Sequence, residues 1–140
     1  MTAPKVLVGI TTYEGKEYIR RRLIQNVKNF NYPNFTVLIV DNSPTKDYYI
    51  KLKRELPSNF KVAHTERGPN SRWALANSQN YIKNYAIEHK YDYVLSLESD
   101  LLPQPTIIQD LMKHGKQVCG AMYYIGFEGK VFASNSGKQL

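Results

Sequence analysis

The sequence predicts a three-layer α/β/α fold, in which a mainly parallel β-sheet lies between helices on both faces. The first observation is that short apolar runs rich in β-branched residues alternate along the chain with segments of helical periodicity. The second is that these runs are continuous, which is typical of parallel strands buried on both faces. The third is a length of 140 residues without repeats or linker-like stretches, which suits a single domain over 1–140.

Three strands and two helices are predicted in the first half of the chain. The apolar runs 6–10 and 35–40 are the strongest strand signals, and 60–64 is a weaker one. Between the first two, 18–30 places apolar residues at helical spacing, with arginines mostly on the other side. A shorter helix is expected around 46–56, and a proline follows it. Strand–helix–strand order of this kind predicts right-handed crossovers and parallel pairing.

The second half of the chain repeats the pattern and then ends in a hairpin. Residues 71–89 form a long helical stretch that leads into a strand over 93–97. A helix over 105–114 stops at a glycine, which is a common residue after a helix end. A fifth strand is expected over 117–124, and 130–133 are expected to form part of a terminal hairpin.

Charge and cysteine content narrow the classes of partner. The chain carries 19 Lys and Arg against 12 Asp and Glu, a formal net charge of +7. This balance favours anionic partners such as nucleic acid, phosphorylated small molecules or an acidic membrane surface.

No apolar run approaches the ~20 residues of a membrane span, and no secretory signal is recognisable. The single cysteine, Cys119, falls in the expected fifth strand and should be buried. A cytoplasmic location is therefore expected.

Polar side chains follow three of the predicted strands, at the edge where open parallel sheets bind their ligands. They are Thr11, Thr12, Tyr13 and Glu14 after the first strand, Asp41 and Asn42 after the second, and Glu98, Ser99 and Asp100 after the fourth. Two carboxylates two residues apart repel each other unless a cation or a hydrogen-bond donor compensates. Mn²⁺ or Mg²⁺ suits such a pair, because it takes one or two carboxylates together with substrate phosphates. The alternative is that Ser99 and Asp100 cap the following turn or helix.

Other polar residues suit a nucleoside diphosphate. The ring of Tyr13 can stack on a base, and Asp41 can accept a hydrogen bond from an imide N–H such as that of uracil. Arg72 opens the long helix, and its guanidinium could reach a diphosphate or a base edge. Local alternatives stay open, because Asp41 also fits a plain Asx turn and Arg72 also fits a solvated arginine near a helix start.

These motifs, in this order, resemble the nucleotide-binding half of a GT-A-fold glycosyltransferase, and most of all glycosyltransferase family 2. Residues 11–14, Thr-Thr-Tyr-Glu, match the Thr/Ser-x-Tyr-Asn-like turn of that family, and 41–43 match its Asp-Asp-Gly-Ser-like turn. An arginine-led helix begins at 71–74, and Glu-Ser-Asp at 98–100 matches the Asp-x-Asp motif. The resemblance covers roughly residues 4–125.

The resemblance implies a UDP-type sugar donor and a role for each matched residue. Thr11 and Tyr13 would hold the nucleobase and its ribose, and Asp41 would accept from the uracil N3–H. Arg72 would lie near the base or the diphosphate, while Glu14 stands where an asparagine is common.

The same resemblance implies a divalent cation and leaves the catalytic base unassigned. Asp100 would coordinate Mn²⁺ or Mg²⁺, and Glu98, which replaces the usual first aspartate, would contact the ribose or the water shell of the metal. The base of the family is a carboxylate well beyond this motif. Here only Asp110, expected on a surface helix, and Glu128, expected in a hairpin turn, follow. The length fits the donor-binding half of an enzyme of the resembled family. Three explanations stay open: the natural chain continues past Leu140, a partner subunit completes the site, or the site is minimal.

The favoured function is a glycosyltransferase that moves a sugar from a UDP-type donor to an unknown acceptor, with inversion implied by the resemblance. A non-catalytic nucleotide-sugar-binding module is the first alternative. A basic α/β protein that binds nucleic acid through 20–22 and 51–54 is a weaker one, since no aromatic-interleaved basic stripe is present. The same clusters could hold the chain against the anionic inner face of a membrane. Self-association into a homo-oligomer stays open.

Overall fold

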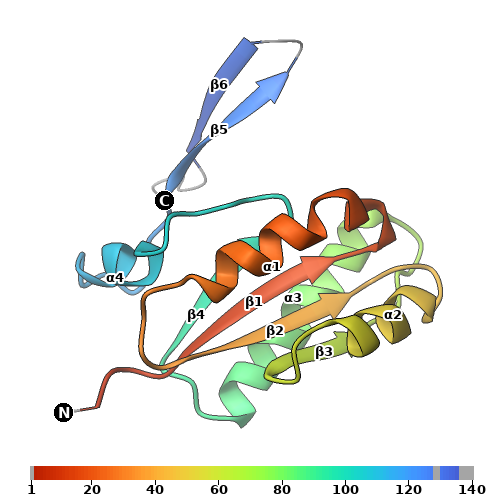
Figure 1. Cartoon of the computed structure of the whole chain (residues 1–140), viewed down its shortest axis with the longest axis horizontal. Helices are drawn as coiled ribbons and strands as arrows, with labels where there is room; N and C mark the ends of the chain where they lie inside the picture. The colour runs from red at the N-terminus through yellow and green to blue at the C-terminus, as the bar shows by residue number, and fades with distance from the viewer. Residues whose placement is uncertain (1, 128–129, 136–140) are drawn as a thin grey trace.

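The described part of the chain contains a four-stranded parallel sheet and a separate antiparallel pair of strands (Figure 1). The computed structural model describes residues 2–127 and 130–135. In chain order the elements are β1 (Val6–Thr12), the 3₁₀ helix η1 (Glu14–Ile19), α1 (Arg20–Lys28), β2 (Phe35–Asp41), α2 (Asp47–Glu55), β3 (Phe60–His64), α3 (Ser71–Glu88), β4 (Tyr93–Glu98), α4 (Ile107–Met112), β5 (Met122–Phe127) and β6 (Lys130–Asn135). The parallel sheet has the order β3-β2-β1-β4, and β5 pairs with β6.

The predicted three-layer arrangement is confirmed, with α1 and α2 on one face of the sheet and α3 on the other (Figure 1). Side chains at alternate positions of β1 enter different cores. Val8 and Ile10 pack with residues of α1, α2 and α4, whereas Leu7 packs with Ile82 of α3. Every residue of β1 is buried, as its continuous apolar run predicted for a strand covered on both faces.

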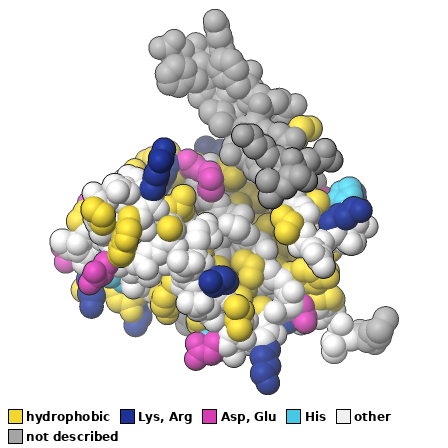
Figure 2. Space-filling view, turned by 180° about the vertical axis from the view of Figure 1, so that it is seen from behind, with side chains coloured by type: hydrophobic (Ala, Val, Ile, Leu, Met, Phe, Trp, Pro, Cys, Tyr) yellow, Lys and Arg dark blue, Asp and Glu magenta, His cyan; other side chains and the backbone are white. Residues whose placement is uncertain are grey.

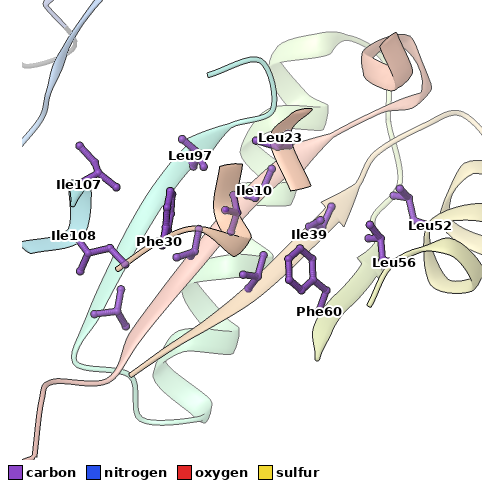
Figure 3. Close-up of a cluster of buried hydrophobic side chains, with 14 of the residues drawn as sticks. Ile10, Leu23, Phe30, Ile39, Leu52, Leu56, Phe60, Leu97, Ile107 and Ile108 are labelled. Atoms are coloured by element: carbon purple, nitrogen blue, oxygen red, sulfur yellow. The ribbon is translucent and has the colours of Figure 1, made fainter. Parts of the chain in front are cut away.

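The larger core fixes α1 and α2 against the sheet (Figure 3). Leu23 of α1 and Leu52 of α2 point toward Ile10 and Ile39 of the two central strands. Leu52 is 1% exposed and Ile10 is fully buried. Full burial of one such aliphatic side chain contributes about 1.5–3 kcal/mol. This packing holds α1, and with it the η1 turn that joins β1 to α1.

The other face of the sheet requires a glycine in β1. A Cβ added to Gly9 would lie 2.5 Å from Cγ2 of Ile82, closer than two carbon atoms approach. The buried stripe of α3 is otherwise made of small side chains, namely Ala74, Ser78 and Ala86. Small residues on the helix and glycine in the strand therefore let α3 lie directly on β1.

The predicted fifth strand over 117–124 is wrong at its start. β5 begins at Met122, and Cys119 is exposed rather than buried. The physical reason is that β5 forms an antiparallel pair with β6 and does not add to the parallel sheet, in which β4 is the edge strand. The hairpin expected around 130–133 is confirmed by this pairing. Its turn, including Glu128, lies outside the described residues.

Ion pairs join η1, α1 and α2. Glu17 accepts hydrogen bonds from Nε of Arg20 at 2.8 Å and from Nζ of Lys51 at 2.9 Å. Arg20 also pairs with Glu55 at 2.6 Å. Arg20 and Lys51 belong to the basic clusters considered above as nucleic-acid contacts, and here they are paired within the protein. On the α3 side of the molecule, Lys and Arg side chains are spread singly rather than gathered in a stripe (Figure 2).

Acid is expected to remove part of the stability through Glu17. Burial raises the pKa of Glu17, but hydrogen bonds from Arg20, Lys51 and Tyr48 outweigh it and lower the pKa from 4.5 to about 2. A carboxylate whose pKa is lowered by folding stabilises the protein above its unfolded pKa. That contribution is lost as the pH falls from about 4.5 to about 2. Since the side chain is 38% exposed, we expect a loss of about 1 kcal/mol after solvent screening.

Urea unfolding at about pH 6 and about pH 3 measures this loss. In Glu17→Gln, the difference in the free energy of unfolding between the two pH values should shrink by about the same amount. Glu66→Gln, at an exposed position, should keep the wild-type difference. Equal pH dependence in wild type and Glu17→Gln would contradict the assignment.

Candidate functional site

The carboxyl ends of the four parallel strands bring the predicted site residues into register. Thr12 of β1 pairs with Asp41 of β2, and Thr11 pairs with Glu98 of β4. On the other side of β2, Asp41 pairs with His64 at the end of β3. Thr11, Thr12 and Asp41 are buried, whereas Glu98 is exposed. Residues from distant parts of the sequence thus meet at one edge of the sheet.

Asp41 is fully buried, and its carboxylate organises the turn after β2. Its Oδ1 accepts from the backbone N–H of Ser43 at 3.0 Å and from the Ser43 hydroxyl at 2.6 Å, while Oδ2 lies 2.9 Å from Nδ1 of His64. The bond to the Ser43 N–H is the Asx turn considered for this residue. Oγ of Ser43 also accepts from the backbone N–H of Glu14 at 2.8 Å. Asp41 therefore ties the turns after β1 and β2 together, and its contact with an imide N–H stays a prediction.

Asn42 and Arg67 extend this network toward the aromatic residue of the first turn. Asn42 donates from Nδ2 to Oγ of Ser78 at 3.1 Å and accepts at Oδ1 from Nη1 of Arg67 at 3.1 Å. The guanidinium carbon of Arg67 lies 5.0 Å from the centroid of the Tyr13 ring. A cation over an aromatic face is attracted to it. The ring expected to stack on a base therefore already carries an arginine.

The acidic motif at the end of β4 carries an ion pair. Nζ of Lys16 donates to Oδ2 of Asp100 at 2.8 Å, and the two side chains are 27% and 37% exposed. The hydrogen bond to Asp100 raises the pKa of Lys16, and burial only partly opposes it. Ser99 is buried and Glu98 is exposed. The N-cap of α4 is Thr106, so neither Ser99 nor Asp100 caps that helix.

Arg72 lies in the first turn of α3 and is exposed. The helix start is fixed by Asn70, whose Oδ1 accepts from the backbone N–H of Trp73 at 2.9 Å. Gly68 has a φ of 66°, and a Cβ there would lie 2.1 Å from Cε3 of Trp73. The tryptophan ring therefore packs over the loop before the helix. Among the described residues Arg72 forms no ion pair, which leaves its charge available for an anion.

Comparison with known proteins places the chain in a family. The sequence matches the Anp1 family over residues 22–130, most of its length. The chain belongs to the Anp1 family.

The Anp1-family chain is similar to the crystal structure of S. aureus TarS 1–349 in complex with UDP-GlcNAc, with a TM-score of 0.57 and 23% identity over 78% of this chain and 30% of that chain. TarS 1–349 in complex with UDP gives a TM-score of 0.50 and 24% identity over 78% of this chain and 31% of that chain. Among curated proteins no match is found.

These similarities confirm the predicted fold and the resemblance that implied it. The Anp1 family is of the glycosyltransferase type, and the Anp1-family chain has the GT-A-like α/β fold seen in TarS. The chain spans about 30% of the length of the TarS structure.

Sequence reasoning missed three contributors to the site of this Anp1-family chain. His64 ends β3 and Arg67 follows it three residues later, and neither was assigned a role. Their place at the same edge as the other strand ends was the available signal. Lys16 was assigned no role either, although it reaches Asp100, 84 positions along the chain.

Proposed function

We propose that this Anp1-family chain is the donor-binding part of a glycosyltransferase that takes a UDP-type sugar and a divalent cation. The observation that carries the proposal is the meeting of Thr11, Asp41 and Glu98, from three strand ends, at one edge of the sheet. The family supports transferase chemistry. The similar TarS structures are complexes with UDP-GlcNAc and with UDP. A net charge of +7 favours an anionic donor.

Mn²⁺ or Mg²⁺ is part of this proposal because the carboxylates suit an ion shared with the phosphates of the donor, and not an ion held by protein ligands alone. Within residues 2–127 and 130–135, no three His, Cys, Asp or Glu side chains come together as a metal site. Glu98 and Asp100 suit a hard cation that takes one or two carboxylates and completes its shell with phosphate oxygens. Asp100 would be the ligand, and Glu98 would contact the ribose or the water shell. Such an ion neutralises the leaving nucleoside diphosphate.

The residues of the first two turns would hold the nucleoside. Thr11 and Tyr13 would contact the base and its ribose, and Asp41 would accept from the imide N–H. Stacking on Tyr13 requires Arg67 to share the ring or to leave it. Arg72 would face the diphosphate, for which its guanidinium geometry is suited.

Transfer breaks the bond between the anomeric carbon and a phosphate oxygen and forms one to an acceptor oxygen. The electron pair of the broken bond stays on the diphosphate, and the acceptor hydroxyl loses its proton to a base. We assign no base here. Asp110 accepts from Gln104 at 2.6 Å and from Thr106 at 2.7 Å on α4, and Glu128 lies outside the described residues. Inversion at the anomeric carbon is part of the proposal.

Calorimetric titration with UDP tests the proposal. UDP should bind the chain in the presence of Mn²⁺, and chelation of the metal should weaken binding at least about tenfold. No heat with any nucleoside diphosphate would contradict both a transferase and a nucleotide-sugar-binding module. Release of UDP from a labelled UDP-sugar then separates the two, because a module binds without turnover.

The location of the chain and its contact with a membrane remain predictions. Among the described helices, none has both the length and the apolar composition that crossing a bilayer requires. A cytoplasmic location and peripheral contact with an anionic membrane are expectations from charge and composition. Nucleic-acid binding is disfavoured, because Arg20 and Lys51 are engaged with acidic partners inside the protein.

A further inference from the structure

Lys16 places a cation on the carboxylate that is proposed to hold the metal. Its Nζ donates to Oδ2 of Asp100 at 2.8 Å. The residue lies in η1, directly after β1, and its backbone N–H donates to the carbonyl oxygen of Tyr13 at 2.9 Å. The first turn therefore positions the ammonium group against a motif that follows a different strand.

Lys16 and a divalent cation compete for the same carboxylate, because Lys16 already bonds its Oδ2. An ammonium group is a compact charge that donates hydrogen bonds to a carboxylate, and a metal ion needs the lone pairs that those bonds use. Both side chains are partly exposed, at 27% and 37%. Ion pairs at such positions contribute little to stability, so the pair can be exchanged. Lys16 would then need another anion, and a diphosphate at this edge would supply one.

We propose that Lys16 occupies the cation position at Asp100 in the free protein and turns to the diphosphate when a metal–nucleotide complex binds. This inference rests on the proposed function. It makes metal and nucleoside diphosphate bind as a coupled pair, because the diphosphate both contributes metal ligands and takes Lys16 away from Asp100. Coupling of this kind is reciprocal, so UDP raises the affinity for Mn²⁺ by the factor by which Mn²⁺ raises the affinity for UDP.

The test measures Mn²⁺ binding from the electron paramagnetic resonance signal of the free ion, with and without UDP. In Lys16→Gln, Mn²⁺ alone should bind about two- to fivefold more tightly than in wild type, since the competing cation is gone. The coupling factor between UDP and Mn²⁺ should fall in that variant. Lys16→Arg keeps the charge and should resemble wild type in the absence of UDP.

A matched control is Lys28→Gln, which removes the same charge elsewhere. Lys28 ends α1 and lies beside Phe35 and Asn59. Phe35 is the first residue of β2, so Lys28 lies at the amino ends of the strands, away from Asp100. The Lys28→Gln variant should bind Mn²⁺ with the affinity of wild type. If Lys16→Gln and Lys28→Gln bind Mn²⁺ equally, the inference is overturned. It is overturned as well if Lys16→Arg binds Mn²⁺ alone more tightly than wild type, a comparison that remains if the glutamine variant does not fold. Failure of UDP to bind wild type at any Mn²⁺ concentration instead contradicts the proposed function.

Discussion

Replacing Asp100 with alanine is expected to abolish metal-dependent UDP binding, with a loss of affinity of about 100-fold or more. Loss of a group that only supports a metal ligand costs about 10–100-fold in affinity, and Asp100 is proposed as a ligand itself. Its side chain is 37% exposed and bonded to Lys16, so the fold does not depend on it. The free energy of unfolding should change by less than about 0.5 kcal/mol. Calorimetric titration with UDP and Mn²⁺, together with urea unfolding, measures the two effects.

Asp110→Ala is the matched control for this experiment. Asp110 is also a carboxylate beyond β4, half-buried with its side chain 33% exposed, but it is bonded within its own segment by Gln104 and Thr106. Its loss should leave UDP affinity unchanged. Wild-type Mn²⁺ dependence in Asp100→Ala would contradict metal ligation by Asp100.

Replacing Asp41 with alanine is expected to have the largest effect on stability, a loss of about 3–5 kcal/mol. Its carboxylate is fully buried and has three partners, namely the N–H and hydroxyl of Ser43 and the ring of His64. Removing it leaves buried donors without an acceptor, and each such donor costs about 1–3 kcal/mol. Urea unfolding measures the loss. UDP binding should weaken as well, because Asp41 ties the turns that are proposed to hold the base.

Two further variants separate the buried carboxylate from a general effect of charge. Asp41→Asn keeps the volume and one acceptor oxygen, so it should cost less than alanine does. Asp47→Ala removes an exposed carboxylate at the start of α2 and should lie within about 0.5 kcal/mol of wild type. Equal stability of the alanine variants at positions 41 and 47 would contradict the structural role given to Asp41.

Much of the fold was predictable because the signals are local. The apolar run that became β1 is buried over its whole length, as a strand covered on both faces must be. The place of Asp41 and Glu98 at the ends of buried strands was also readable, since it depends only on where each apolar run stops. Cys119 shows the limit of such reasoning, because an apolar run forms a buried strand only where the sheet offers it a neighbour.

The sequence by itself determined that this chain alternates buried strands with helices and that carboxylates follow the first, second and fourth of those strands. Only the tertiary structure decided which of these groups meet. His64 reaches Asp41 because β3 pairs with β2 in one register, and Lys16 reaches Asp100 because β1 and β4 are neighbours. Strand order and register arise from contacts between residues far apart in the chain, through packing that no local pattern encodes. Asp41 and Asp100 were recognisable in the sequence as carboxylates after strands. The contact of Lys16 with Asp100 was recognisable only in the fold.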